Sequence, residues 1–65
     1  MEKIIRDAKG RVACIADPLT GSIEIKYSKI TVQAALEIGK TLTIEREGIV
    51  TKITRLSTTD IRVAT

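Results

Sequence analysis

The residue types that most often perform chemistry are scarce in this sequence. The chain of 65 residues has one cysteine, Cys14, and no histidine. A cysteine nucleophile needs a nearby base and an electropositive setting that lowers the pKa of its thiol. The neighbours of Cys14 in the segment RVACIA are apolar, and no histidine exists to act as the base. Cys14 is therefore predicted to be a small, buried core residue.

The carboxylates and glycines have the spacing of surface and turn residues. Glu45 and Glu47 flank a predicted turn, and the other acids are isolated, so no pair suited to acid–base catalysis is indicated. Phosphate-binding loops need clustered glycines ahead of a helix, whereas the four glycines here lie 9 to 18 residues apart. Structural zinc uses four Cys or His ligands, and this chain has one at most. We predict that the protein is not an enzyme and that it has no cofactor or metal.

Basic residues near the first predicted turn are the candidate nucleic-acid contacts. The chain has 11 Lys and Arg against 8 Asp and Glu, which gives a net charge of +3. Tyr27 is the only aromatic residue, so any binding would depend on phosphate contacts and not on stacked bases. Alternatively, these charges only keep sheet edges from pairing. The candidates are Lys3, Arg6, Lys9 and Arg11, with Lys52, Arg55 and Arg62 as a second group.

Strands are the elements that must position these residues. Ile, Val and Thr account for 24 of the 65 residues, and β-branched side chains suit a pleated surface better than a helix. Apolar residues alternate with polar ones in runs joined by turns, which predicts an antiparallel meander. We expect one mainly β domain over residues 1–65, closed into a small barrel or a folded sandwich. Strands are predicted at 4–6, 11–16, 22–28, 40–45, 49–56 and 61–63, with a three-residue hairpin loop at 46–48.

Residues 30–38 are compatible with two structures. Read with period 2, they form a strand with one apolar face, from Ile30 to Ile38. Read with period 3.6, residues 31–38 form a short helix, with Thr31 as its N-cap and Gly39 at its C-terminal end. The nine-residue alternation favours the strand, and the helix is retained as the alternative.

The small core predicts self-association. A chain of this size hides only about 60% of its unfolded surface, and a single cysteine allows no intrachain disulfide. The predicted strand 11–16 is apolar on both faces, and its second face must be covered. A two-fold homodimer is the simplest closed solution. We expect Ile15 and Val50 near the contact, unless a helix at 31–38 covers that face within one chain.

Three segments resemble a known family. Residues 7–12 (DAKGRV), 35–45 (ALEIGKTLTIE) and 48–55 are similar to pieces of the swapped-hairpin transcription factors of the AbrB and MazE kind. Members of that family are dimers whose basic strands contact DNA, and the resemblance implies the same role here. It covers about half of the chain. In the family the strand after the GRV turn leads straight into a helix, whereas here residues 17–29 (DPLTGSIEIKYSK) intervene.

Together these features predict a non-enzymatic interaction module that acts through protein–protein contacts as a homo-oligomer. The alternative is a small, basic, dimeric DNA-binding transcriptional regulator. A cytoplasmic location is expected, because the lone cysteine fits a reducing compartment. The opening MEKIIRDAKG lacks the apolar core of a signal peptide, and no segment has the 18 apolar residues of a membrane span.

Overall fold

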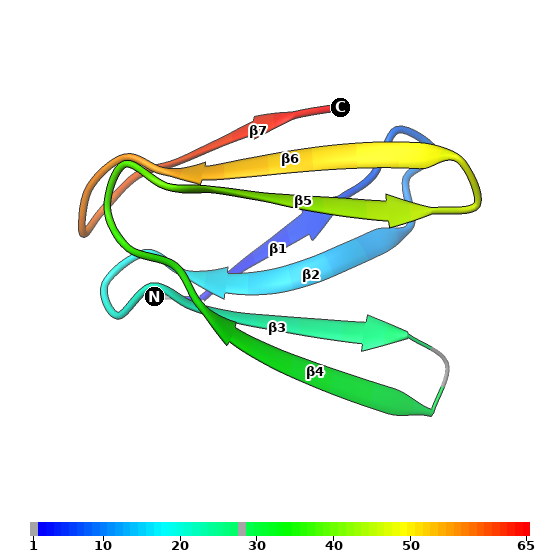
Figure 1. The fold of residues 1–65 in the computed structure, drawn as a ribbon, viewed down its shortest axis with the longest axis horizontal. Helices are drawn as coiled ribbons and strands as arrows, with labels where there is room; N and C mark the ends of the chain where they lie inside the picture. Colours follow the sequence, from blue (N-terminus) through cyan, green and yellow to red (C-terminus); the bar gives the residue numbers. More distant parts are fainter. Residues whose placement is uncertain (1, 28) are drawn as a thin grey trace.

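The chain folds into two antiparallel sheets (Figure 1). The computed structural model describes residues 2–27 and 29–65, and no helix occurs within them. One sheet has four strands in the order β1-β2-β3-β4, and the other has three in the order β5-β6-β7. The strands are β1 Lys3–Arg6, β2 Val12–Asp17, β3 Ser22–Tyr27, β4 Ile30–Ala35, β5 Thr41–Arg46, β6 Ile49–Arg55 and β7 Ile61–Ala64.

The predicted mainly β class and the antiparallel meander are confirmed, since every strand pairs with its neighbours in sequence within each sheet. The two sheets are not closed into a barrel. β4 and β5 follow one another in the chain but belong to different sheets, and no ladder joins those sheets in the described part of the chain. The predicted end of the third strand, Ser28, lies outside the described residues.

The segment from residue 30 to residue 38 contains a strand, and the alternative of a helix is wrong. β4 pairs residue for residue with β3, from Tyr27 opposite Ile30 to Ser22 opposite Ala35. The backbone of Leu36 continues this pattern, because its N–H donates to the Gly21 carbonyl at 2.8 Å. This ladder satisfies the backbone groups that face β3 from Ile30 to Leu36, so tertiary pairing prevails over the local helix preference of the alanines.

The apolar core lies between the two sheets. Four of its buried side chains come from the four-stranded sheet, and Ile53 comes from the other. Cys14 is only 1% exposed, which confirms its predicted place in the core. Burial raises the pKa of its thiol to about 11. The buried members are Ile5, Cys14, Ala16, Ile23 and Ile53, and Ile25, Leu36, Leu42, Ile44 and Ile61 pack around them.

A β-bulge in β2 explains why that strand is apolar on both sides. Ile5 pairs with Cys14 and Arg6 pairs with Val12, so Ala13 is an extra residue without a partner on β1. A bulge bends its strand and changes where the side chains point. As a result Ala13 and Cys14, although adjacent, are both buried, at 7% and 1% exposure. Other residues of the same chain therefore bury Ala13, and no second copy is needed to cover it.

The turn between β5 and β6 is shorter than predicted. β5 ends at Arg46 and β6 begins at Ile49, so the loop has two residues, and the predicted three-residue loop at 46–48 is wrong. Glu47 has φ 54° and Gly48 has φ 80°. Positive φ at both central residues is typical of a type I′ turn, whose twist matches that of the flanking strands. Arg46 is thereby held in the strand.

Arg55, at the end of β6, fastens three segments at one end of the molecule. Its Nε donates to the Pro18 carbonyl at 2.9 Å, and its two terminal nitrogens donate to the carbonyls of Leu36 and Leu19, each at 3.0 Å. The β2–β3 turn and the β4–β5 connection thus meet at one guanidinium. We call this region the clamped end.

Candidate functional site

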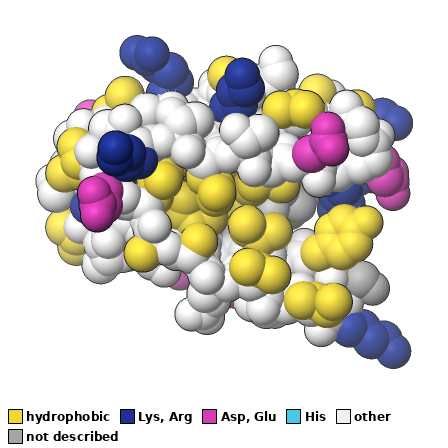
Figure 2. Space-filling view, in the orientation of Figure 1, with side chains coloured by type: hydrophobic (Ala, Val, Ile, Leu, Met, Phe, Trp, Pro, Cys, Tyr) yellow, Lys and Arg dark blue, Asp and Glu magenta, His cyan; other side chains and the backbone are white. Residues whose placement is uncertain are grey.

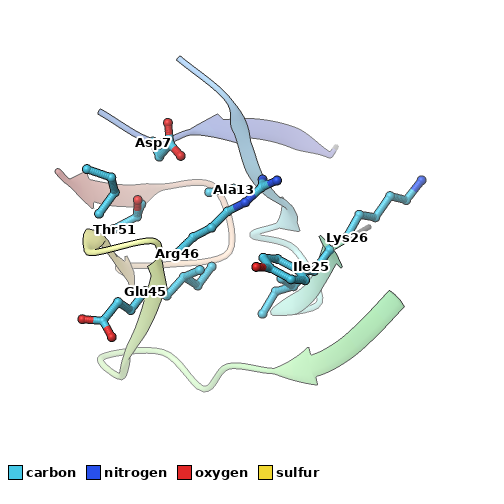
Figure 3. A pocket seen from close by; sticks show the side chains of 10 residues that line it. Asp7, Ala13, Ile25, Lys26, Glu45, Arg46 and Thr51 are labelled. Atoms are coloured by element: carbon cyan, nitrogen blue, oxygen red, sulfur yellow. The ribbon is translucent and has the colours of Figure 1, made fainter. Parts of the chain in front are cut away.

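A cleft lies at the opposite end of the strands, which we call the open end. Its volume is about 150 Å3, and both sheets contribute to its walls (Figure 3). β2 pairs with β3 only from Ile15 opposite Glu24 to Asp17 opposite Ser22. Beyond the bulge at Ala13 the two strands diverge, and the cleft lies beside the last residues of β3. Its lining residues are Asp7, Ala13, Ile25, Lys26, Tyr27, Ile44, Glu45, Arg46, Ile49 and Thr51.

Arg46 and Tyr27 bring the two sheets together at this cleft. The guanidinium carbon of Arg46, on β5, lies 5.0 Å from the centre of the Tyr27 ring, on β3. This is cation–π geometry. The Nε of Arg46 is buried and has no hydrogen-bond partner among the described residues. A buried donor without a partner is costly, so this end of the molecule leaves one polar group of Arg46 unsatisfied.

A network of ion pairs ties together two of the three turns at the open end. Asp7 is buried, and its Oδ1 accepts from the backbone N–H groups of Lys9 and Arg11 at 2.9 and 3.0 Å. The Arg11 side chain donates from Nε to Asp7 at 3.1 Å and from Nη1 to Glu47 at 2.9 Å. Arg11 therefore links the β1–β2 turn to the β5–β6 turn.

The protonation of this network follows from its hydrogen bonds. Burial opposes ionisation of Asp7, but the hydrogen bonds from Arg11 and Lys9 and the charge of Arg11 outweigh it, so the pKa of Asp7 is lowered. The hydrogen bond from Arg11 also lowers the pKa of Glu47, and in return Glu47 raises the pKa of Arg11. Both carboxylates are ionised at neutral pH, and the network is a structural tie.

An uncovered apolar surface continues from the cleft along the β3–β4 hairpin. Three residues form it, and we call them the apolar strip: Tyr27 is 48% exposed, Val32 48% and Ile30 62%. The register places Ile23 opposite Ala34, Ile25 opposite Val32 and Tyr27 opposite Ile30. Paired residues point to the same face of a sheet, so the strip is the outward continuation of the core face that holds Ile23. Figure 2 shows hydrophobic side chains across the middle of this side of the molecule and over the hairpin.

The basic candidates predicted from the sequence lie together on the β1–β2 hairpin, but they are not equally available. Lys3, Arg6 and Lys9 are exposed, and Arg6 donates from Nη1 to the Gly10 carbonyl at 2.9 Å. Arg11 is bound by Asp7 and Glu47. In the second basic group, Arg55 is occupied at the clamped end, whereas Lys52 and Arg62 are exposed.

The two residues predicted at an oligomer contact lie on different sheets. Ile15 is half-buried and has Ile4 and Glu24 as its neighbours across the strands, on the side facing away from the core. Val50 is 36% exposed and lies opposite Glu45 on β5. Because they occupy the outer faces of two sheets that share one core, the structure does not bring them together.

Sequence reasoning identified neither the cleft nor the apolar strip as a site. The sequence pattern places Tyr27 on one face of its strand with Ile23 and Ile25, and it predicts a loop at Arg46, which the structure places at the end of β5. The alternation of Ile23, Ile25 and Tyr27 does indicate one apolar face, but the point at which its cover ends depends on the bulge at Ala13. No feature of the segment RVACIA marks that extra residue.

The cleft combines an apolar floor with the Tyr27 ring and the Arg46 side chain, a mixture of apolar and polar groups that is common in binding pockets. Within residues 2–27 and 29–65, no group of three or more His, Cys, Asp or Glu is placed to hold a metal ion. No helix of the described chain is long and apolar enough to cross a membrane.

Comparison with family models, curated proteins and solved structures finds no match to this chain.

Proposed function

We propose that the protein is a non-enzymatic interaction module that acts in the cytoplasm through protein–protein contacts and works as a homo-oligomer. The observation that carries this proposal is the apolar strip beside the cleft. Tyr27, Ile30 and Val32 lie on the core face of their hairpin, yet each is about half exposed or more. Contiguous exposed apolar surface on a small protein is typical of a contact site.

The finer architecture is part of the same proposal. We regard the two sheets as a folded sandwich that Arg55 ties together at the clamped end and whose core face is left incompletely covered along the β3–β4 hairpin at the open end. A partner seated on the apolar strip would extend the core outward from Ile25 and Val32. Cys14, buried as a free thiol, fits the reducing compartment that we propose.

Sedimentation equilibrium of the full chain over a wide range of concentration tests this function. We expect a mass that rises above 7.1 kDa as the concentration increases. The melting temperature should increase with it, because association stabilises the folded state by mass action. A constant mass of 7.1 kDa, together with a cooperative melt that does not depend on concentration, would show that the monomer is sufficient.

DNA binding is the second candidate function, and one observation favours it. Lys3, Arg6 and Lys9 are exposed on a single hairpin, where they can approach phosphates together. Such binding would weaken steeply with salt, because each phosphate contact releases counterions. Replacing Lys3, Arg6 and Lys9 with Ser should abolish it for every duplex tested, while the bonds of Arg11 to Asp7 and Glu47 stay intact. A gel-shift assay at about 50 mM salt, where phosphate contacts are strong, would eliminate this function if no duplex is retarded.

A further inference from the structure

The four strands at the sheet edges differ in how they are protected against pairing with another chain. Natural edges are blocked by charges, prolines, bulges or short length. β1 carries Lys3 and Arg6 and faces a bulge, β5 ends in Glu45 and Arg46, and β7 has only four residues. β4 has the sequence ITVQAA, six residues without a charge or a proline. Its ladder with β3 is regular over its whole length.

We propose that β4 pairs antiparallel with β4 of a second copy, across a two-fold axis at Val32. This inference rests on the proposed homo-oligomer and identifies its contact surface. The occupant must be a strand, because an edge strand offers unpaired backbone N–H and C=O groups. A second β4 is a suitable strand, since neither copy brings a charge to the pairing. The resulting sheet has β1 at both of its outer edges, where Lys3 and Arg6 prevent further addition, so the assembly closes at two copies.

The apolar strip fixes the register of this pairing. In an antiparallel ladder about a two-fold axis perpendicular to the sheet, residues of the core face must pair with residues of the same face. An axis at Val32 places Ile30 opposite Ala34 of the second copy and Val32 opposite its counterpart. The exposed strips of the two copies then become one continuous apolar surface. An axis at Gln33 also preserves the faces, but it leaves Ile30 outside the paired region.

The polar face of the hairpin favours the same register. On each chain Lys26 lies opposite Thr31, and Glu24 lies opposite Gln33. With the axis at Val32, Thr31 pairs with Gln33 of the second copy, so each cross-strand row has Lys26 at one end and Glu24 at the other. With the axis at Gln33, the central row would have Glu24 at both ends. The ends of a row are three strand spacings apart, about 14 Å, so this preference is small beside that of the apolar strip.

Interchain disulfide formation tests the pairing and its register. Directly opposed residues of an antiparallel ladder have Cα atoms about 4.5–5.5 Å apart, which is within the range of a disulfide. Val32→Cys should therefore form a covalent dimer under mild oxidation. Gln33→Cys is the matched control, because its two copies would lie beyond the limit of about 7 Å. The wild-type chain should not crosslink, since its only thiol, Cys14, is buried.

A second pair of variants tests the surface without any crosslink. Ile30 on β4 and Ile4 on β1 are both 62% exposed and both lie on edge strands. We expect Ile30→Lys to raise the dimer dissociation constant by about tenfold or more, because it brings an unpaired charge into the contact. Ile4→Lys should change it less than about twofold, as is usual outside an interface. Both constants are measured by sedimentation equilibrium.

The outcomes separate this inference from the function on which it rests. Crosslinking of Val32→Cys, with weaker association of Ile30→Lys, supports the β4 pairing. If Gln33→Cys crosslinks instead, the register is wrong. If the protein associates but neither cysteine crosslinks and Ile30→Lys associates normally, the β4 contact is overturned and the homo-oligomer stands. A monomer at every concentration overturns both.

Discussion

The two ends of this molecule use an arginine in opposite ways. At the clamped end, Arg55 donates three hydrogen bonds to the carbonyls of Pro18, Leu19 and Leu36, and so joins two chain segments to β6. At the open end, Arg46 lies against the Tyr27 ring, and its buried Nε has no hydrogen-bond partner among the described residues. The Arg55 guanidinium has an acceptor for each of its three nitrogens, whereas the Arg46 guanidinium leaves its Nε unpaired.

The ends also differ in how completely their turns are joined. At the open end Arg11 links the β1–β2 turn to the β5–β6 turn. Among the described residues, no hydrogen bond or ion pair connects the β3–β4 hairpin to either turn, and Tyr27 of that hairpin meets β5 through its contact with Arg46. In Figure 1 that hairpin extends away from β5. The comparison teaches that the connections at one end of the strands are joined by hydrogen bonds, whereas the β3–β4 hairpin at the other end is held mainly by its own ladder.

The largest effect is expected from a substitution that breaks the clamped end. Gly21 has φ 78°, and a Cβ at this position would collide with the Leu36 carbonyl and with the Arg55 side chain. Gly21→Ala should destabilise the protein by about 3 kcal/mol or more, since backbone strain and a steric clash combine. Gly10→Ala is the matched control: Gly10 has φ 79° but open space around it, so only strain of about 1–2 kcal/mol is expected. Urea unfolding measures both, and equal losses would show that close packing at Gly21 is unimportant.

A smaller effect should come from exchanging the two arginines in turn for methionine. Arg55→Met leaves three main-chain carbonyls without their donor, and we expect a loss of about 2 kcal/mol in the free energy of unfolding. Arg46→Met removes a cation–π contact and also an unpaired donor, so its cost should stay below about 1 kcal/mol. Arg55→Lys should not rescue the clamp, because an ammonium group lacks the planar fork. Similar losses for the two methionine variants would contradict the distinction between the ends.

Replacing Cys14 tests how much the core between the two sheets contributes to stability. Cys14→Ala should lower the free energy of unfolding by about 1 kcal/mol, because it leaves a small void. The native thiol should react slowly with alkylating reagents and quickly in denaturant. The folded pKa of about 11 lies above the ordinary value of 9.0, so the folded state holds its proton longer than the unfolded state. Stability should therefore fall as the pH rises above about 9, and Cys14→Ala should remove that part of the decline.

The smallest effect is expected at the ion pairs of the open end and is read from acid unfolding. The pKa of Asp7 is lowered from 3.8 in the folded protein. Its contribution to stability is therefore present above pH 3.8 and is lost as the pH falls through the folded pKa. Asp7→Asn should flatten this part of the stability curve and leave the alkaline side unchanged. An acid slope as steep as that of the wild type would show that Asp7 does not carry it.

Strand order could be predicted from the sequence, because period-2 alternation and turn residues are local signals. The predicted strands at 4–6, 11–16, 49–56 and 61–63 each overlap a strand of the structure. Glu47 illustrates what local signals miss, since its positive φ depends on how β5 and β6 twist around a two-residue turn. Arg55 illustrates a second limit. Its three acceptors come from segments 19 to 37 residues away in the chain, and nothing near it in the sequence distinguishes it from an exposed cation.

The cleft depends on the number of residues in β2, because the bulge adds one residue, Ala13, to that strand. It does not depend on the chemistry of a particular side chain. Ala13 is the additional residue, because Val12 and Cys14 pair with consecutive residues of β1. The bend at this bulge allows β2 to diverge from β3. Deleting that residue would restore an unbroken ladder, and β2 would then cover the part of β3 that is now open. We therefore expect insertions and deletions in β2, more than substitutions in the cleft, to be the mutational steps that close or open this end. Hydrogen exchange of the Lys26 amide, which lies on the side of β3 that faces β2 because alternate residues of β3 bond to β4, would record the change in an Ala13 deletion variant, as slower exchange if the gap closes.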